Sequence, residues 1–178
     1  MPGVGWLRYI LGRAINRATV SIDSNIQTRS ASVGDKEFII SLLPRLAEFG
    51  PPSWRDAAQM TATDTQVLSD RLLNQPPGTA IFIAEDDKGV ALGFIHLQTG
   101  TDYYNHEEHG HIADIVVAPE GEGRGIGRVL IEKGEEWARS QGYRLLTLSV
   151  FAQNLRAREI YKRLGYGEDM MKYVKELV

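Results

Sequence analysis

The segment Pro119–Arg128, with the sequence PEGEGRGIGR, constrains the fold of this chain more than any other part of the sequence. It lies between an apolar run, Ile112–Val117, and a helical pattern that begins near Ile126. Its closely spaced glycines lack the Cβ atoms that would keep an anion away from the backbone, and a helix start directs N–H groups and a positive dipole end toward the same spot. The segment therefore predicts a strand–loop–helix unit that binds a pyrophosphate, with Arg124 and Arg128 adding positive charge.

A glycine-rich loop is a weak signal by itself, because glycines near a helix start often form only a tight turn. Two other phosphate-binding loops are excluded. The segment lacks the Gly-Lys-Ser/Thr ending of a Walker loop, and the strand before it follows a hairpin-like region instead of opening a βαβ unit. Downstream, the pattern predicts an amphipathic helix over Ile126–Gln141, a buried strand over Arg144–Phe151, and a short helix from Asn154 to Gly165 that leads into a last strand.

Three motifs occur here in a recognisable order and spacing. They are Val117-x-Pro119 before the loop, a pattern of the type R/Q-x-x-G-x-G/A over 122–127, and Asn154…Ala157…Tyr161…Leu164-Gly165-Tyr166 after it. With these motifs the sequence resembles the GNAT superfamily, the acyl-CoA-dependent N-acetyltransferases. The resemblance runs from about Gln27 to the C-terminus. One departure is plain, since position 122 carries Glu where the family usually has Arg or Gln.

The preceding part of the chain supplies strands and two helices. The patterns predict a first strand, a helix capped by Asp35 that Pro44 kinks and that ends near Gly50, and a second helix capped by the box Thr63-x-x-Gln66. The remaining predicted ranges are Ile26–Ser32, Asp64–Asn74, Ala80–Glu85, Val90–Thr99 and Gly110–Val117. This order predicts an α/β layer arrangement with helices packed on a mixed sheet. The resemblance implies that this is the GNAT fold, with a mixed, mostly antiparallel central sheet and helices on both faces.

Length and composition fit one such domain over residues 25–178. The first 24 residues fall outside the resemblance and form an amphipathic N-terminal extension, in which Trp6, Leu7, Ile10, Leu11, Ala14 and Ile15 share one helical face. Packing of this helix against the fold or a neighbouring subunit is favoured over a targeting or membrane-surface role.

Several function classes are disfavoured by composition. The chain has no Cys, so it has neither disulfides nor a Cys nucleophile, and the expected location is cytoplasmic. A net charge of −3 offers no general basic field for nucleic acid, and no apolar run approaches the length that crosses a bilayer. The mild acidity suits a cationic amine substrate.

The resemblance implies a binding site for acetyl-CoA, used as a co-substrate without a metal. The pantetheine arm would enter between the fourth and fifth strands, and the backbone N–H of Val117 would face the thioester carbonyl and stabilise the oxyanion. Asn154 would bond the pantetheine amides, although it is equally an ordinary helix N-cap. The implied cofactor-binding residues are Ile115, Val116, Val117, Glu122, Gly123, Arg124, Gly125, Ile126, Gly127, Arg128, Asn154 and Tyr161.

Three residues are candidates for proton transfer. The resemblance implies that Tyr161 protonates the departing thiolate, the alternative being a packing tyrosine. His111 and Asp114 match positions where the family places a base for the amine. In a regular strand His109 and His111 share one face and Asp114 takes the other, so these residues line the same cleft only if a bulge intervenes. The alternative is a solvent-exposed strand end at His111 and a hydrogen-bonded aspartate at position 114.

The motif His106-x-x-His109-x-His111 also allows a metal reading, which is disfavoured because a catalytic zinc needs a third protein ligand with supporting contacts. The loop Thr101–His109 is expected to help form the acceptor pocket. The resemblance implies that Glu48, Trp54 and Arg55 face this pocket, the alternative being that each is an exposed loop residue.

Taken together, the resemblance and the residues that carry it imply an N-acetyltransferase that moves an acetyl group from acetyl-CoA to a primary amine by direct attack. The acceptor is a small-molecule or peptide amine, and a homodimer is an option that the family allows. Two alternatives stay open: a non-catalytic sensor that binds acyl-CoA, and a protein that uses the loop for a metal or a nucleotide phosphate.

Overall fold

The structure is a computed structural model, and it describes residues 25–48 and 51–177. The predicted N-terminal extension lies outside these residues. In chain order the elements, with η marking 3-10 helices, are β1 (Gln27–Ser30), η1 (Val33–Asp35), α1 (Lys36–Leu42), η2 (Leu43–Ala47), α2 (Ala57–Asn74), β2 (Thr79–Glu85), β3 (Ala91–Thr101), β4 (Glu108–Val117), η3 (Pro119–Gly121), α3 (Ile126–Ser140), β5 (Leu146–Leu148) and α4 (Leu155–Arg163).

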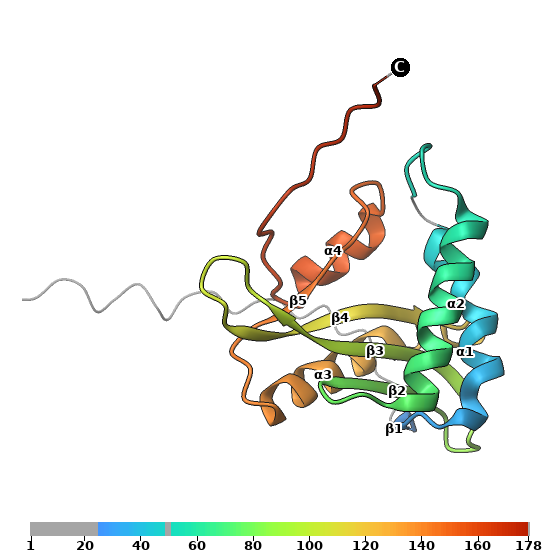
Figure 1. The fold of residues 1–178 in the computed structure, drawn as a ribbon. Helices are drawn as coiled ribbons and strands as arrows, with labels where there is room; N and C mark the ends of the chain where they lie inside the picture. Colours follow the sequence, from blue (N-terminus) through green and yellow to red (C-terminus); the bar gives the residue numbers. More distant parts are fainter. Residues whose placement is uncertain (1–24, 49–50, 178) are drawn as a thin grey trace, which may run out of the picture.

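The strands form one five-stranded sheet in the order β1-β2-β3-β4-β5 (Figure 1). Neighbouring strands from β1 to β4 are antiparallel, and β5 runs parallel to β4. Phe94 and Val116 pack with α1 and α2 on one face, whereas Ile95 and Ile112 pack with α3 on the other. The predicted α/β fold, with a mixed, mostly antiparallel sheet and helices on both faces, is confirmed.

A β-bulge interrupts β4. His96 of β3 pairs with Asp114, but the next residue, Leu97, pairs with Ile112, so that Ala113 is an extra residue on β4. A bulge reverses the alternation of side chains along the strand that contains it. On the face toward α1 and α2, β4 therefore presents odd-numbered residues before the bulge and even-numbered residues after it.

The pairing of β4 with β5 is short. It covers only Gly110–Ile112 on β4 and Leu146–Leu148 on β5, so the predicted strand Arg144–Phe151 is shorter than expected. Beyond Ile112 the two strands diverge, and the remainder of β4 has no partner from β5. This divergence leaves an edge of β4 open for a ligand.

The predicted start of α2 is wrong. The helix begins at Ala57, where the Asp56 carboxylate accepts a hydrogen bond of 2.7 Å from the N–H of Gln59. Thr63 lies inside the helix and donates its hydroxyl to the Gln59 carbonyl at 2.9 Å. A threonine that bonds four residues back satisfies its hydroxyl without ending a helix, so the sequence of a capping box was misread as a boundary.

The interruption at Pro44 is confirmed in a different form. The α-helix ends at Leu42 and the chain continues as the 3-10 helix η2, with Pro44 in its first turn. Proline is tolerated there because the first N–H groups of a helix have no intrahelical partner.

The predicted last strand is also wrong. Residues 167–177 contain no strand, and they run away from the body of the protein (Figure 1). Glu168 accepts a hydrogen bond of 2.8 Å from Arg158 and lies 3.4 Å from Lys162, which ties the start of this segment to α4. With only three residues, β5 offers a very short edge for a further strand.

Candidate acetyl-CoA site

The glycine-rich loop adopts a conformation that needs glycine. Gly123 has φ +75° and Gly125 has φ +82°, in the left-handed region that other residues rarely adopt. A Cβ at Gly121 would lie 2.9 Å from the Leu92 carbonyl oxygen, so this glycine lets the loop pack on β3. A Cβ at Gly123 would meet nothing within 4 Å, so its surroundings are open to a ligand.

The backbone N–H groups of this loop are only partly paired within the described residues. Arg124 and Arg128 donate their N–H groups to the carbonyls of Gly121 and Gly125, at 3.3 Å and 3.0 Å. The described residues provide no backbone acceptor for the N–H groups of Gly123, Gly125 and Ile126. Unpaired donors at the start of a 15-residue helix are the arrangement that binds phosphate.

Glu122 contacts arginines that lie outside the glycine-rich loop. Its carboxylate accepts a hydrogen bond from Arg45 of η2 and lies 3.8 Å from Arg156 of α4. Arg128 instead pairs with Glu132 on α3 at 2.8 Å. Glu122 thereby connects the loop to η2 and α4, and two arginines from outside the motif lie next to the predicted phosphate site.

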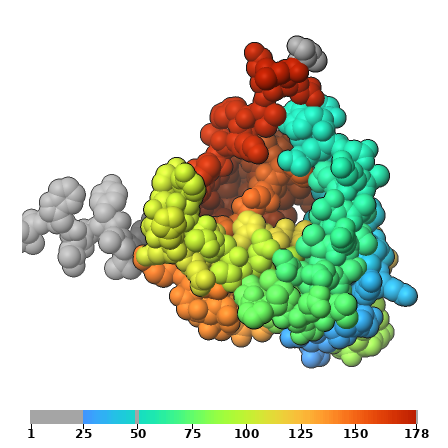
Figure 2. All heavy atoms as spheres, in the orientation of Figure 1, coloured from blue at the N-terminus to red at the C-terminus, as the bar shows by residue number. Residues whose placement is uncertain are grey.

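A hollow opens above β4 and α4 (Figure 2). In this view it is bordered by the loop between β3 and β4, by the segment before α2, and by the C-terminal segment. The loop between β3 and β4 exposes Tyr103 and Tyr104, whose rings pack edge to face at 5.3 Å, and Trp54 of the segment before α2 is also exposed. The two predicted walls of the acceptor pocket thus lie on opposite sides of one concave surface.

The bulge at Ala113 brings the two candidate bases to the same face of the sheet. Ile112 packs toward α3, so its neighbour His111 faces α1 and α2, and Asp114 shares that side with Val116 because of the extra residue. The charges of the two groups interact, since Asp114 acts to raise the pKa of His111. The separation expected for a regular strand does not occur.

Asp114 has a buried partner that the sequence did not reveal. The Nδ1 atom of His96 on β3 lies 2.8 Å from Asp114 Oδ2, and the two side chains are 1% and 16% exposed. Asp64 of α2 lies close enough for burial and the Asp114 charge to raise the pKa of Asp64. The available signal was a histidine inside the apolar run Leu92–Leu97, which indicates a polar group that needs a partner.

His111 lies at the point where β4 and β5 separate. Its Nδ1 atom is 2.8 Å from the Thr147 hydroxyl, which also lies 3.3 Å from the Gly110 carbonyl and donates to it. The hydroxyl then accepts from Nδ1–H, which leaves the lone pair of His111 on Nε2. Burial, followed by the charge of His109, lowers the pKa of His111, so its ring is neutral at neutral pH.

Tyr161 of α4 is partly buried against Tyr166, with ring centroids 6.0 Å apart. Burial raises the pKa of Tyr161 and, as the largest of several causes, raises that of Tyr166 to about 12. A phenol with a raised pKa stays protonated at neutral pH, as a proton donor must. Asn154 is the N-cap of α4 and accepts from the Ala157 N–H at 3.1 Å, as the structural alternative predicted.

The Val117 amide points toward the open edge of β4. Ala118 donates its N–H to the Leu92 carbonyl at 2.8 Å, toward β3. In an antiparallel pair successive residues direct their N–H groups to opposite sides. Val117 therefore directs its N–H away from β3, to the side where pairing with β5 has ended.

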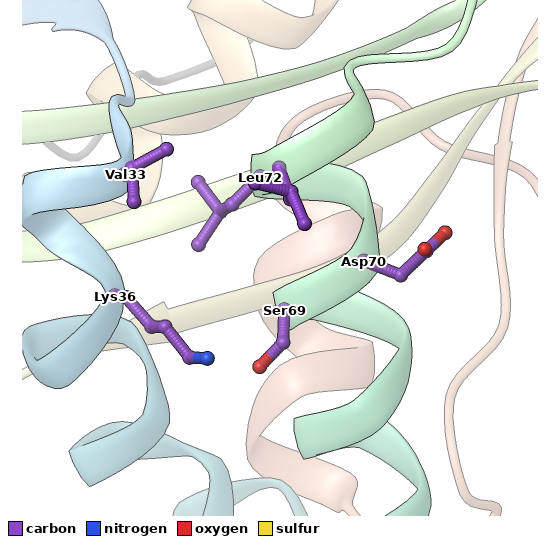
Figure 3. A pocket seen from close by; sticks show the side chains of 6 residues that line it. Val33, Lys36, Ser69, Asp70 and Leu72 are labelled. Carbon is purple, nitrogen blue, oxygen red and sulfur yellow. The ribbon is translucent and has the colours of Figure 1, made fainter.

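Other features of the described residues lie outside this arrangement. No group of three or more His, Cys, Asp or Glu side chains there is placed to hold a metal ion. No helix in the same part of the chain combines the length and hydropathy of a bilayer span. A surface pocket of about 300 Å³ lies between the start of α1 and the end of α2, lined by Val33, Lys36, Ser69, Asp70, Leu72 and Leu73 (Figure 3), on elements that carry none of the predicted site residues.

Comparison with known proteins agrees with this geometry. Residues 43–166 match the acetyltransferase (GNAT) family. A thialysine N-epsilon-acetyltransferase of Bos taurus is 30% identical over 146 residues, which cover 79% of this chain and 83% of the relative. An uncharacterized N-acetyltransferase of Methanocaldococcus jannaschii is 46% identical over 88 residues, covering 49% of this chain but only 39% of the relative.

Solved structures of N-acetyltransferases share this fold. The GCN5-related N-acetyltransferase from Ralstonia eutropha JMP134 superposes with a TM-score of 0.65 at 21% identity, covering 84% of this chain and 98% of that one. The family match spans β4, the glycine-rich loop and α4, which together carry the predicted site. The chain belongs to the acetyltransferase (GNAT) family, and the prediction of an acetyl-CoA-dependent N-acetyltransferase is confirmed.

Proposed function

We propose that residues 25–178 transfer an acetyl group from acetyl-CoA to the amine of a small molecule, by direct attack and without a covalent enzyme intermediate or a metal. The observation that carries the proposal is the alignment of three features along one open edge: the donor-rich loop, the outward-facing Val117 amide, and the divergence of β5 from β4. The pyrophosphate binds the loop and the start of α3, and the pantetheine arm follows the β4 edge past Ile115, Val116 and Val117.

The chemistry then requires three steps. The amine loses a proton to His111 or Asp114 and attacks the thioester carbon, while the Val117 N–H stabilises the oxyanion. The tetrahedral intermediate collapses to the amide, and the C–S bond breaks. The leaving thiolate takes a proton from Tyr161, whose pKa is raised by burial and whose hydroxyl is therefore protonated.

The acceptor is expected to be cationic before it loses its proton. The walls of the hollow carry aromatic side chains, and Asp64 and Asp114 lie close together on the face that β4 presents to α2. Carboxylates and aromatic faces attract an ammonium group. The bovine relative is named for acetylating an ε-amine of thialysine, which agrees with this class of acceptor.

The remaining expectations belong to the same proposal. The protein acts in the cytoplasm without nucleic acid or membrane, and a homodimer remains open. A non-catalytic acyl-CoA sensor is the second candidate. It is disfavoured by the proton-transfer groups, since a sensor has no need of a protonated, partly buried tyrosine on α4 or of acid–base side chains on β4.

A panel of amines tests the proposal. Polyamines, amino acids, aminoglycosides and peptide N-termini are incubated with acetyl-CoA, and the release of free CoA thiol is measured. Release above hydrolysis for one class identifies the acceptor. Tight acetyl-CoA binding by calorimetry, without amine-dependent release for any class, would instead establish the sensor.

A substitution of Tyr161 tests the chemistry. Tyr161→Phe keeps the ring and removes the hydroxyl, so kcat should fall by about 10²-fold, at the low end for general acid catalysis, while acetyl-CoA affinity stays the same. Tyr166→Phe is the matched control, because its ring packs against Tyr161 and its hydroxyl has no hydrogen-bond partner among the described residues. A wild-type kcat for Tyr161→Phe, with chemistry rate-limiting, would remove the assignment.

A further inference from the structure

His96 has no part in the function proposed above, yet it is the most deeply buried polar side chain near the site. It lies on β3 at the position where the β4 bulge occurs, and its side chain is 1% exposed. Nδ1 contacts Asp114, while Nε2 has no hydrogen-bond partner within the described residues. A histidine enclosed in this way cannot contact a substrate, so any function it has passes through Asp114.

The unpaired nitrogen fixes the tautomer. If His96 were doubly protonated, Nε2–H would be a buried donor on a cation with no acceptor, which costs more than an unpaired lone pair. The contacts of His96 therefore favour the tautomer with the proton on Nδ1 and a lone pair on Nε2. His96 donates Nδ1–H to Asp114 Oδ2, and this bond leaves Oδ1 of the carboxylate to accept another proton.

Distances along β4 then distinguish the two candidate bases. Residues of a strand rise about 3.3 Å each, so Asp114 lies about 10 Å from Val117, whereas His111, with one residue taken up by the bulge, lies about 17 Å away. The attacking nitrogen must approach to about 3 Å from the thioester carbon, and the base must reach it directly or through one water. Asp114 satisfies this limit and His111 exceeds it.

We propose that His96 is a positioning residue for the acetyl transfer, holding the Asp114 carboxylate in the orientation in which Asp114 is the proton acceptor for the amine. This inference rests on the proposed function. The groups that face Asp114 are Asp64 from α2, His96 from β3 and His111 on β4 itself. Asp64 opposes the charge of Asp114, and the His96 bond offsets that opposition.

Two substitutions of His96 separate positioning from packing. His96→Leu removes the donor at similar volume, and His96→Asn places an amide N–H near the position of Nδ1. A hydrogen bond to a charged group contributes about 1.5–3 kcal/mol, so His96→Leu should lower kcat/KM by about 10-fold or more. The acid limb of its pH profile should move to higher pH, since the ionised carboxylate loses its donor. His96→Asn should retain kcat/KM within about 3-fold.

Two further measurements keep the inference separate from the proposed function. Acetyl-CoA affinity by calorimetry should be the same in both variants, because His96 does not reach the cofactor. In ¹⁵N-histidine-labelled protein, the His96 ring should show the Nδ1–H tautomer, and Asp114→Asn should change its signals whether or not any amine is acetylated.

The outcomes are distinct. Equal loss in His96→Leu and His96→Asn with an unmoved acid limb, or wild-type activity in both, would overturn the positioning role. The positioning role would also be overturned if the His96 ring showed the Nε2–H tautomer and its NMR signals were the same in Asp114→Asn. If His96→Leu does not fold, His96→Gln replaces it, because its amide lies one bond too far to substitute for Nδ1. Failure of every amine, with the NMR result as expected, would reject the proposed function and leave the His96–Asp114 bond established.

Discussion

Replacing Glu122 by Gln should tighten the binding of CoA. The carboxylate lies in the loop that is proposed to hold the pyrophosphate, and it occupies Arg45 and Arg156. Glu122→Gln removes one negative charge and leaves both arginines available to the phosphates, without altering a glycine.

The size of the gain follows from exposure and distance. Glu122 is 41% exposed, so its charge acts through a largely aqueous dielectric. Two unit charges about 7 Å apart then interact by about 0.6 kcal/mol, or about 1.2 kcal/mol for the two charges of a pyrophosphate. Screening with a Debye length of about 8 Å reduces this to about 0.5 kcal/mol at physiological salt. We expect Kd for CoA to fall about 5-fold at low salt and about 2-fold at physiological salt.

Calorimetric titration of CoA at two ionic strengths measures the effect. Glu136→Gln is the control, because Glu136 pairs with Lys133 on α3 at 2.7 Å and lies more than two turns from the loop. Because Glu122→Gln loses the ion pairs with Arg45 and Arg156, its free energy of unfolding should fall by about 0.2–1 kcal/mol. Weaker CoA binding by Glu122→Gln at low salt would refute the reasoning, and would show that Glu122 organises the arginines or the loop.

Three other predictions follow from the structure. Gly123→Ala should destabilise the protein by about 1 kcal/mol, from its positive φ, and should weaken CoA binding; Gly89→Ala, with the same φ of +75° and open space, should destabilise it equally with unchanged CoA affinity. His111→Gln should leave the acid limb of the kcat/KM pH profile in place. Loss of that limb in the variant would assign the base to His111 instead of Asp114. The hydrogen bonds of Arg29 lower the pKa of Asp35 to about 2, so this pair should stabilise the fold by about 1–2 kcal/mol above pH 4 and lose that contribution as pH falls toward 2. Asp35→Asn should abolish this acid dependence in thermal melts, and an unchanged melting profile would contradict the assignment.

Features that depend on neighbouring residues could be predicted from the sequence. The glycine-rich loop, the start of α3 at Ile126 and the helix ends before Gly142 and Gly165 all depend on a backbone preference within a few positions. The predicted start of α2 was wrong because Asp56 and Thr63 both have side chains that can cap a helix. The sequence alone does not show which of them accepts from an unpaired N–H.

Features that depend on distant residues could not be predicted. Arg45 lies 77 positions before Glu122, and His96 lies 18 positions before Asp114, so only the folded sheet and helices bring them together. The last strand needs an edge of sufficient length, and β5 has only three residues. Local patterns thus predicted the glycine-rich loop that is proposed to bind the cofactor, whereas the partners of its charged residues came from the tertiary structure.

The extra residue in β4 acts on the shape of the strand and not through its own side chain. Removing Ala113 would make Ile112 and Asp114 direct neighbours in a regular strand, so His111 and Asp114 would still share the face toward α2. The deletion would remove the bend and the added twist that a bulge gives to its strand, and with them the present spacing between His111 and Asp114. An exchange such as Ala113→Ser keeps the bulge, so a mutational scan restricted to substitutions would overlook this contribution.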